Sequence, residues 1–87
     1  MSYTVRFSPA AARAFDKLSP EVKRRLGPKI DELASDPRPP AAKALQGQAD
    51  LMALRVGEYR VLYRIRDAIL EVLVVRVAHR REVYRRL

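Results

Sequence analysis

The spacing of apolar and polar positions over residues 3–34 changes from an alternating pattern to a helical one. Residues 3–7 alternate between apolar and polar side chains, which predicts a half-buried strand. Apolar side chains then recur at helical spacing over residues 9–18 and again over residues 20–34. Ser8 and Ser19 precede these stretches, each followed directly by proline, and a serine before a proline is a typical helix start. The pattern predicts one strand followed by two helices.

The remainder of the chain predicts strands. Residues 36–48 are rich in turn formers, and we expect a loop or an extended arm there. Two alternating stretches flank Gly57 and Glu58, as in a hairpin with a two-residue loop. An aliphatic stretch at residues 69–77 predicts a further strand that is largely covered on both faces. Together these elements make a single α+β domain over residues 1–87.

The hairpin loop determines which side chains face each other. Gly57 at the first loop position favours a type II′ turn, which sets Val56 opposite Tyr59 and Arg55 opposite Arg60. One face of the hairpin is then apolar and must lie in the core: Met52, Leu54, Val56, Tyr59, Val61, Tyr63 and Ile65. Like charges directly opposite each other destabilise a hairpin, so the paired arginines on the other face indicate a phosphate site. The plainer alternative is that they keep a basic protein soluble.

The strand at residues 69–77 can be placed in the same way. A second tight turn at residues 67–68 would set Arg64 opposite Glu71, and this opposite-charge pair contributes roughly 0.2–1 kcal/mol to that register. The strand then runs back to the end of the sheet that carries Arg55 and Arg60. The chain continues there into a basic segment.

Composition narrows the range of partners. The chain has 18 Lys and Arg against 10 Asp and Glu, a formal net charge of +8 that favours an anionic partner. Charge alone is compatible with nucleic acid, a membrane surface or an acidic protein. The absence of cysteine excludes disulfides and thiolate metal sites. No stretch has the pattern of a signal peptide or a membrane span, and we expect a cytoplasmic protein without membrane contact.

The hairpin and the segment after it carry side chains suited to an RNA phosphodiester. Guanidinium groups bind phosphate, and an imidazole with an ordinary pKa of about 6.5 transfers protons near neutral pH. The chain has its only histidine at His79, followed by Arg80 and, further on, Tyr84. No acidic residue is placed to hold a metal ion in this region. We therefore expect chemistry without a metal or a cofactor.

Several motifs in this region occur together and in order. They are Lys-Ala-Leu-Gln-Gly at 43–47, Arg-Val-Gly-Glu-Tyr-Arg-Val-Leu-Tyr at 55–63, and His-Arg followed by Val-Tyr within 79–84. With them the chain resembles the RelE branch of the RelE/ParE toxin superfamily nearly from end to end. The resemblance implies an α+β fold in which two N-terminal helices pack on one face of a small, mainly antiparallel, four-stranded sheet in the order β-α-α-β-β-β. It also implies that the other face is concave and basic.

The resemblance implies an activity as well. RelE-type toxins of type II toxin–antitoxin modules enter the ribosomal A site and cut mRNA without a metal, by driving the 2′-hydroxyl onto the adjacent phosphate. This cleavage inhibits translation, and a cognate antitoxin keeps the toxin inactive. The implied partners are therefore a cognate antitoxin, the ribosome and mRNA, with no small-molecule cofactor.

Four residues match the family's catalytic positions. Arg60 matches the phosphate-binding arginine of Gly-x-Tyr-Arg, and Arg80 is similar to the tail arginine that protonates or stabilises the leaving oxygen. Tyr84 is similar to the terminal tyrosine that acts as a base or stacks on a base, and His79 could take the acid role that histidine has in some relatives. For Tyr84 a plain role as an anchor of the tail stays open. Further candidates for RNA contact are Arg55, Arg81 and Lys43.

The chain departs from the family at Leu51 and Ala53, where well-studied members carry basic residues on the strand before the hairpin arginine. Part of the catalytic charge is then missing, or it is supplied by Arg55, Lys43 or Arg81. For Lys43 a solvated loop charge is the favoured interpretation. Two alternatives to the endonuclease stay open: a ParE-like inhibitor of DNA gyrase, which needs no catalytic residues, and a non-catalytic nucleic-acid-binding domain.

Overall fold

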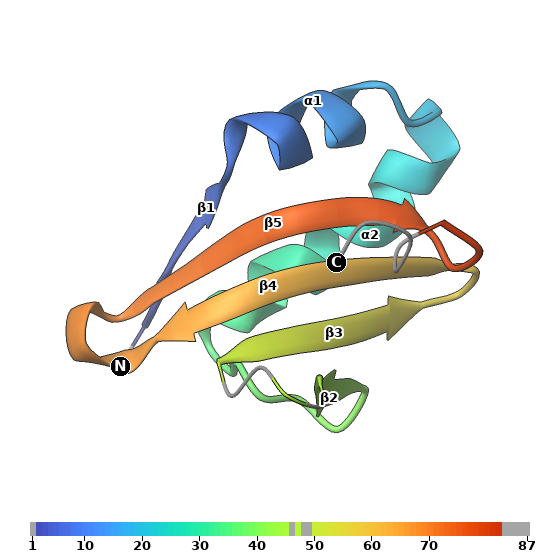
Figure 1. Cartoon of the computed structure of the whole chain (residues 1–87). Coiled ribbons are helices and arrows are strands. Elements are labelled where there is room, and N and C mark those ends of the chain that lie inside the picture. The colour runs from blue at the N-terminus through green and yellow to red at the C-terminus, as the bar shows by residue number, and fades with distance from the viewer. Residues whose placement is uncertain (1, 46, 48–49, 83–87) are drawn as a thin grey trace.

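The computed structural model describes residues 2–45, 47 and 50–82, which form one sheet with two helices against it (Figure 1). The elements are β1 (Thr4–Phe7), α1 (Pro9–Asp16), α2 (Pro20–Asp31), η1 (Glu32–Ala34), β2 (Ala42–Ala44), β3 (Leu51–Val56), β4 (Tyr59–Arg66), η2 (Asp67–Ile69) and β5 (Glu71–His79). The strands lie in the order β1-β5-β4-β3-β2. β1 runs parallel to β5, and the other neighbours are antiparallel. The predicted α+β class is confirmed, with five strands in place of four.

Both helices begin at the predicted serines. The Ser8 hydroxyl oxygen accepts a hydrogen bond from the Ala11 backbone N–H at 3.1 Å, and the Ser19 hydroxyl oxygen accepts one from the Val22 N–H at 3.3 Å. Each bond satisfies one of the N–H groups that the first turn of a helix leaves without a partner. α1 is two residues shorter than predicted, whereas α2 and η1 together cover the predicted residues 20–34. Apolar side chains of both helices pack into one cluster with the sheet, so both lie on the same face.

The β3–β4 hairpin has the predicted register. Gly57 has a φ of 58°, a left-handed conformation that glycine adopts without steric cost. Val56 lies opposite Tyr59, and Arg55 lies opposite Arg60. The predicted core face is confirmed as well: Met52, Leu54, Val61, Tyr63 and Ile65 are buried, and Val56 and Tyr59 pack against them.

The segment that was predicted to be a loop or an extended arm contains the additional strand. Residues Ala42–Ala44 pair antiparallel with β3 and form one edge of the sheet, with Lys43 opposite Ala53. The Ala42 N–H donates to the Pro39 carbonyl oxygen at 2.9 Å, which turns the chain into the strand. Three residues are too few for an alternating pattern to distinguish a strand from a loop.

The connection between β4 and β5 differs from the predicted two-residue turn at residues 67–68. The chain passes through η2 and then through Leu70, which has a left-handed φ of 51°. Pairing therefore begins with Arg66, and not with Arg64, opposite Glu71. Arg66 and Glu71 approach to 3.7 Å. The predicted register was wrong by two residues, so each side chain keeps its predicted face at this end of the sheet.

A β-bulge then changes the faces of β5. Tyr63 lies opposite Val74, but Leu62 lies opposite Arg76, so Val75 is an extra residue in the ladder. Because side chains alternate between faces, one extra residue exchanges the faces of all the residues that follow it. The residues of β5 after the bulge therefore lie on the faces of the sheet opposite to those they would have in an uninterrupted ladder.

An exposed cluster of polar side chains joins the β4–β5 connection to the first half of the chain. The Tyr3 hydroxyl donates to Asp67 Oδ1 at 2.5 Å, and the Arg38 guanidinium donates to both carboxylate oxygens at 3.3 and 2.8 Å. Arg38 first, and Tyr3 second, hold the pKa of Asp67 below its ordinary value. The cluster connects the N-terminal side of β1, the segment after η1, and η2.

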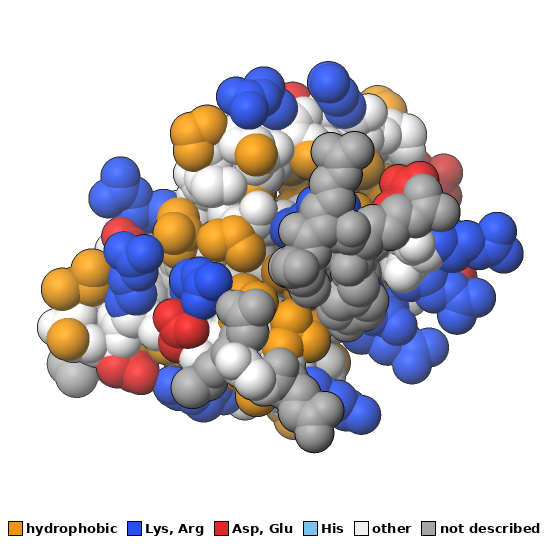
Figure 2. Space-filling model, viewed as in Figure 1, with side chains coloured by type: hydrophobic (Ala, Val, Ile, Leu, Met, Phe, Trp, Pro, Cys, Tyr) orange, Lys and Arg blue, Asp and Glu red, His pale blue; other side chains and the backbone are white. Residues whose placement is uncertain are grey.

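Charged and apolar areas lie side by side on the surface. Figure 2 shows Lys and Arg side chains around the end of the sheet where β3 turns into β4, and hydrophobic side chains between this end and the opposite one. Within the described part of the chain, neither helix has the length and apolar character that a membrane crossing requires.

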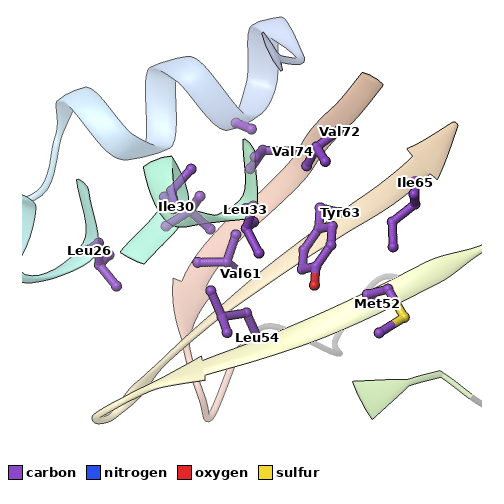
Figure 3. Close-up of a cluster of buried hydrophobic side chains, with 12 residues drawn as sticks. Leu26, Ile30, Leu33, Met52, Leu54, Val61, Tyr63, Ile65, Val72 and Val74 are labelled. Atoms are coloured by element: carbon purple, nitrogen blue, oxygen red, sulfur yellow. The ribbon is translucent and has the colours of Figure 1, made fainter. Parts of the chain in front are cut away.

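Tyr63 is the largest of the fully buried side chains and lies in the middle of the core (Figure 3). Its hydroxyl donates to the Pro37 carbonyl oxygen at 2.7 Å, which ties the proline segment after η1 to the sheet. Burial raises the pKa of Tyr63 to about 12, and the nearby Asp36 carboxylate acts in the same direction. The cause is that a phenolate in the core would lose its hydration.

We expect the stability of the protein to decrease at alkaline pH because of Tyr63. Its folded pKa lies above the unfolded value of 10.0, so its contribution is complete below pH 10 and is lost as the pH rises through about 12. One such group lowers the free energy of unfolding by up to about 1.4 kcal/mol per pH unit. Tyr63→Phe should cost about 1 kcal/mol at neutral pH, since the Pro37 carbonyl loses its donor, but should lose less stability above pH 10. Urea unfolding of both proteins across this range measures the two slopes, and equal slopes would contradict the assignment.

Candidate functional site

Three basic side chains surround one hollow on the face of the sheet away from the helices. The hollow has a volume of about 350 Å³ and is lined by Ala41, Lys43, Ala44, Leu45, Ala53, Arg55 and Arg60. The cations come from three neighbouring strands: Lys43 from β2, Arg55 from β3 and Arg60 from β4. Alanine side chains between them leave the space open.

The strand register explains why these cations share one face. Arg55 and Arg60 lie directly opposite each other, and Lys43 lies opposite Ala53, the residue two positions before Arg55. Residues two apart in a strand, and residues opposite each other, point to the same side of a sheet. The structure therefore brings together three of the residues that the sequence singled out.

None of the three cations forms an ion pair with a carboxylate among the residues that the structure describes. The Arg60 guanidinium donates one hydrogen bond, from Nη1 to the Tyr59 carbonyl oxygen at 3.3 Å. In contrast Arg64, which shares this face of β4, is held by Asp50 at 2.7 Å. The hollow thus concentrates positive charge that the described part of the chain does not neutralise, and an anionic phosphate group fits such a site.

An apolar cluster adjoins the hollow on the same face. Leu51, Ala53 and Leu62 are buried there, with Leu45, Val75 and Ala78 packed against them. Leu51 and Ala53 are the positions at which basic residues were expected from the family, and their burial among aliphatic side chains accounts for the departure. The expected basic concave face is therefore basic in one part and apolar in the other. Among the residues that are described, no group of three His, Asp or Glu side chains could hold a metal ion.

His79 lies away from the hollow. It is opposite Tyr59, and the two rings meet edge to face with centroids 5.6 Å apart. Tyr59 packs against the core on the helix side, whereas Arg60 points to the other side. His79 Nδ1 accepts a hydrogen bond from the Arg81 backbone N–H at 3.3 Å. The structure does not bring His79 and Arg60 together, and the bulge at Val75 is the reason.

Arg80 lies at the hairpin turn. Its Nε is 2.8 Å from Glu58 Oε2, and its backbone N–H donates to the Glu58 carbonyl oxygen at 2.7 Å. Both side chains are about half exposed, so this ion pair contributes little to stability and opens readily. Arg81 is exposed at the end of the described residues. Tyr84, the fourth predicted catalytic residue, lies outside them.

The sequence also matches a known family. A family model described as the ParE toxin of the type II toxin-antitoxin system, parDE, matches residues 5–84. The chain belongs to the RelE/ParE toxin superfamily. This confirms the resemblance seen in the hairpin and tail motifs.

Curated and structural relatives place this RelE/ParE-family toxin in the RelE branch. It is 36% identical to Toxin RelG of Mycobacterium tuberculosis over 99% of this chain and 100% of that protein. The toxin–antitoxin complex RelBE2 from the same organism matches with a TM-score of 0.80 and 34% identity, over 91% of this chain and 99% of that one. The intact Escherichia coli RelBE complex matches with a TM-score of 0.80 and 28% identity, over 90% and 96%.

The paired arginines give a prediction about the stability of this toxin. Arg55→Thr removes the like-charge pair and keeps a good strand former, so the free energy of unfolding should rise by about 0.2–1 kcal/mol at low salt. The gain should shrink at high salt because screening weakens the repulsion. Arg64→Thr is the matched control and should give no gain, since it removes the pair with Asp50. Chemical unfolding at two salt concentrations measures both, and a less stable Arg55→Thr protein would contradict the repulsion.

Proposed function

We propose that this toxin is a ribosome-dependent, metal-independent mRNA endonuclease that inhibits translation and is neutralised by a cognate antitoxin. The observation that carries the proposal is the hollow in which Lys43, Arg55 and Arg60 converge without a carboxylate partner among the described residues. Such a group of cations is costly in an isolated protein and is stabilised by an anion placed between them.

The scissile phosphate would occupy the hollow. In the reaction the mRNA 2′-oxygen forms a bond to phosphorus while the bond from phosphorus to the 5′-oxygen breaks, which leaves a cyclic phosphate and a 5′-hydroxyl. Negative charge builds up on the phosphate oxygens in the transition state, and fixed guanidinium groups stabilise that charge. Arg60 has the central place because it projects from β4, between its neighbouring strands β3 and β5.

Lys43 takes the place of the charge that is absent from β3. It lies opposite Ala53 and lines the same hollow as Arg60. A lysine on β2 therefore reaches the space that a basic residue at position 53 would reach. Arg55 adds a second charge that faces Arg60.

The proton transfers are assigned to side chains of residues 79–84, at and after the end of β5. Arg80 supports the leaving 5′-oxygen once its exposed pair with Glu58 opens, and Tyr84 takes the proton of the 2′-hydroxyl or stacks on a base. His79 would act as the acid only after leaving Tyr59, so the structure favours Arg80 over His79 for that step. Arg81 would contact the RNA backbone as an exposed charge.

A second candidate function is inhibition of DNA gyrase. Two observations favour it: the matching family model is the one described for ParE, and Leu51 and Ala53 form an apolar cluster where the endonuclease would use basic residues. This function relies on binding and needs no catalytic residues. The two candidates differ in whether mRNA is cut.

Arg60→Ala should reduce mRNA cleavage by at least about 100-fold, because a preorganised charge in a transition-state site contributes about that much to the rate. The measurement is a reconstituted translation reaction with mRNA-programmed ribosomes, in which new mRNA ends are mapped by primer extension. Arg66→Ala is the matched control, since Arg66 lies at the far end of β4 against Glu71, and it should cleave like the wild type.

The outcomes of that reaction separate the candidates. New ends in the A-site codon that require both ribosomes and Arg60 support the endonuclease. Intact mRNA together with growth arrest by the wild-type protein would reject the endonuclease in favour of gyrase inhibition. Intact mRNA without growth arrest would leave a non-catalytic binding domain.

The cognate antitoxin should raise the melting temperature of the toxin. The related RelBE2 and Escherichia coli RelBE structures are complexes of toxin and antitoxin, and an acidic segment over the hollow would neutralise its cations. With free antitoxin at 100 times its Kd, the expected stabilisation is about 2.7 kcal/mol, or several degrees. Calorimetry of the free toxin and the complex measures the shift. Equal melting temperatures would rule out a partner that binds the folded toxin.

A further inference from the structure

The basic hollow is the end of a longer depression in the surface. A second hollow of about 480 Å³ adjoins it and shares Ala41 and Arg55 with it. A third hollow of about 230 Å³ shares Lys29, Val56 and Gly57 with the second. The three together form the edge groove, which passes from α2 across the sheet edge at the end of β3 to the outer face of the sheet.

The α2 end of the edge groove is apolar with a basic rim. It is lined by Val22, Arg25, Leu26, Lys29, Val56, Gly57 and Tyr59. Arg25 extends from α2 toward the hairpin, and its Nη1 lies 3.9 Å from the position that a Cβ on Gly57 would occupy. Arg25 has no ion pair with any described residue. A ligand here would bury an apolar group beneath two cations.

The middle of the edge groove exists because β2 is short. β2 pairs with residues 52–54 of β3 only, so the end of the strand at Arg55 and Val56 extends beyond it. Pro39 and Pro40 line the space in front of this end, together with Lys29 and Glu32 of the helix side. The Arg55 N–H has a long hydrogen bond of 3.5 Å to the Ala41 carbonyl oxygen. The hollow at this point leaves space for an extended chain to cross the sheet edge.

The charge along the edge groove indicates what it binds. The lining residues include the cations Arg25, Lys29, Lys43, Arg55 and Arg60, against the single carboxylate of Glu32. Glu32 pairs with Lys29 at 3.8 Å, with both side chains more than half exposed, so it neutralises little. Beneath its two cations the α2 end is lined by the apolar side chains of Val22, Leu26, Val56 and Tyr59, which suit an amino-acid side chain better than a ribose-phosphate backbone. Charge and lining together fit an acidic polypeptide with an apolar anchor.

We infer that the edge groove binds an extended acidic segment of the antitoxin, with an apolar side chain anchored between α2 and the hairpin and carboxylates over Lys43, Arg55 and Arg60. This inference rests on the proposed antitoxin partner. The two ends of the edge groove then differ in function. The basic hollow binds both RNA and the antitoxin, whereas the α2 end binds the antitoxin alone. Substitutions at the α2 end therefore produce a toxin that cuts mRNA normally but escapes neutralisation.

Arg25→Glu tests this division, with Arg24→Glu as its matched control. The two substitutions change the same charge at adjacent, exposed residues of α2, but Arg24 does not line the edge groove. The probe is the purified antitoxin encoded beside the toxin gene, and its Kd is measured by titration calorimetry. Arg25→Glu should weaken binding by about 10–100-fold, since it places a carboxylate beside the acidic segment, while Arg24→Glu stays within about threefold of the wild type. Both variants should retain mRNA cleavage within about twofold.

The results distinguish failure of the edge groove from failure of the proposed function. Equal affinities of the two variants for the antitoxin would overturn the inference. Loss of mRNA cleavage in Arg25→Glu with unchanged antitoxin affinity would assign the edge groove to RNA and would overturn it as well. If the wild-type protein leaves mRNA intact but Arg25→Glu selectively loses the antitoxin, the edge groove stands and only the endonuclease is rejected. Val22→Ser provides a charge-independent check, and its weaker apolar anchor should lower antitoxin affinity without affecting cleavage.

Discussion

The register of the β3–β4 hairpin is the constraint on which both the core and the basic hollow depend. In this register Tyr63 and its neighbours point under the helices, while Arg55 and Arg60 point outward. A slip of β4 by one residue would turn Arg60 and Arg64 toward the helices and Tyr63 away from them. Burial of unpaired charges costs far more than a hairpin can supply, so the slipped register is not accessible. The two-residue turn at Gly57 and Glu58 and the apolar face agree on a single pairing, and the hollow forms as a consequence of the same pairing.

Much of the fold could be predicted because its signals are local. Ser8 and Ser19 mark helix starts through hydrogen bonds that span three residues, and Gly57 marks the hairpin through its own backbone conformation. The features that could not be predicted are those that depend on contacts distant in sequence. The bulge at Val75 leaves no pattern in a mostly aliphatic stretch in which apolar and polar residues do not alternate. The left-handed conformation of Leu70 could not be predicted either, because residues other than glycine rarely adopt it.

In the candidate site, too, the features with local signals could be predicted and those that depend on distant contacts could not. The length of the hairpin loop predicts that Arg55 and Arg60 lie opposite each other, and the structure confirms this pairing. Lys43 was assigned to a loop in the favoured interpretation, yet pairing with β3 makes it part of the same hollow, which only the tertiary structure could show. His79 was expected near Arg60, and the bulge instead carries it to Tyr59 on the opposite face. Arg80 is near the hairpin as expected, but with its charge directed to Glu58.

The parallel pairing of β1 with β5 has a consequence for how the protein is made. β5 lies between β1 and β4, so it is the strand that joins the N-terminal segment to the rest of the sheet, and of the strands in the described part of the chain it is the last to be synthesised. Until it emerges, β1 has no neighbour in the sheet and α1 lacks the strand on which it packs. Assembly therefore waits for a contact between Thr4 and Glu71, at nearly opposite ends of the described chain, and such long loop closures slow folding. A nascent chain that stops before β5 contains β2, β3 and β4 with the cations of the hollow, but it lacks the strand that covers the other edge of β4 and links it to β1. The folded toxin therefore forms only after nearly the whole chain has been synthesised.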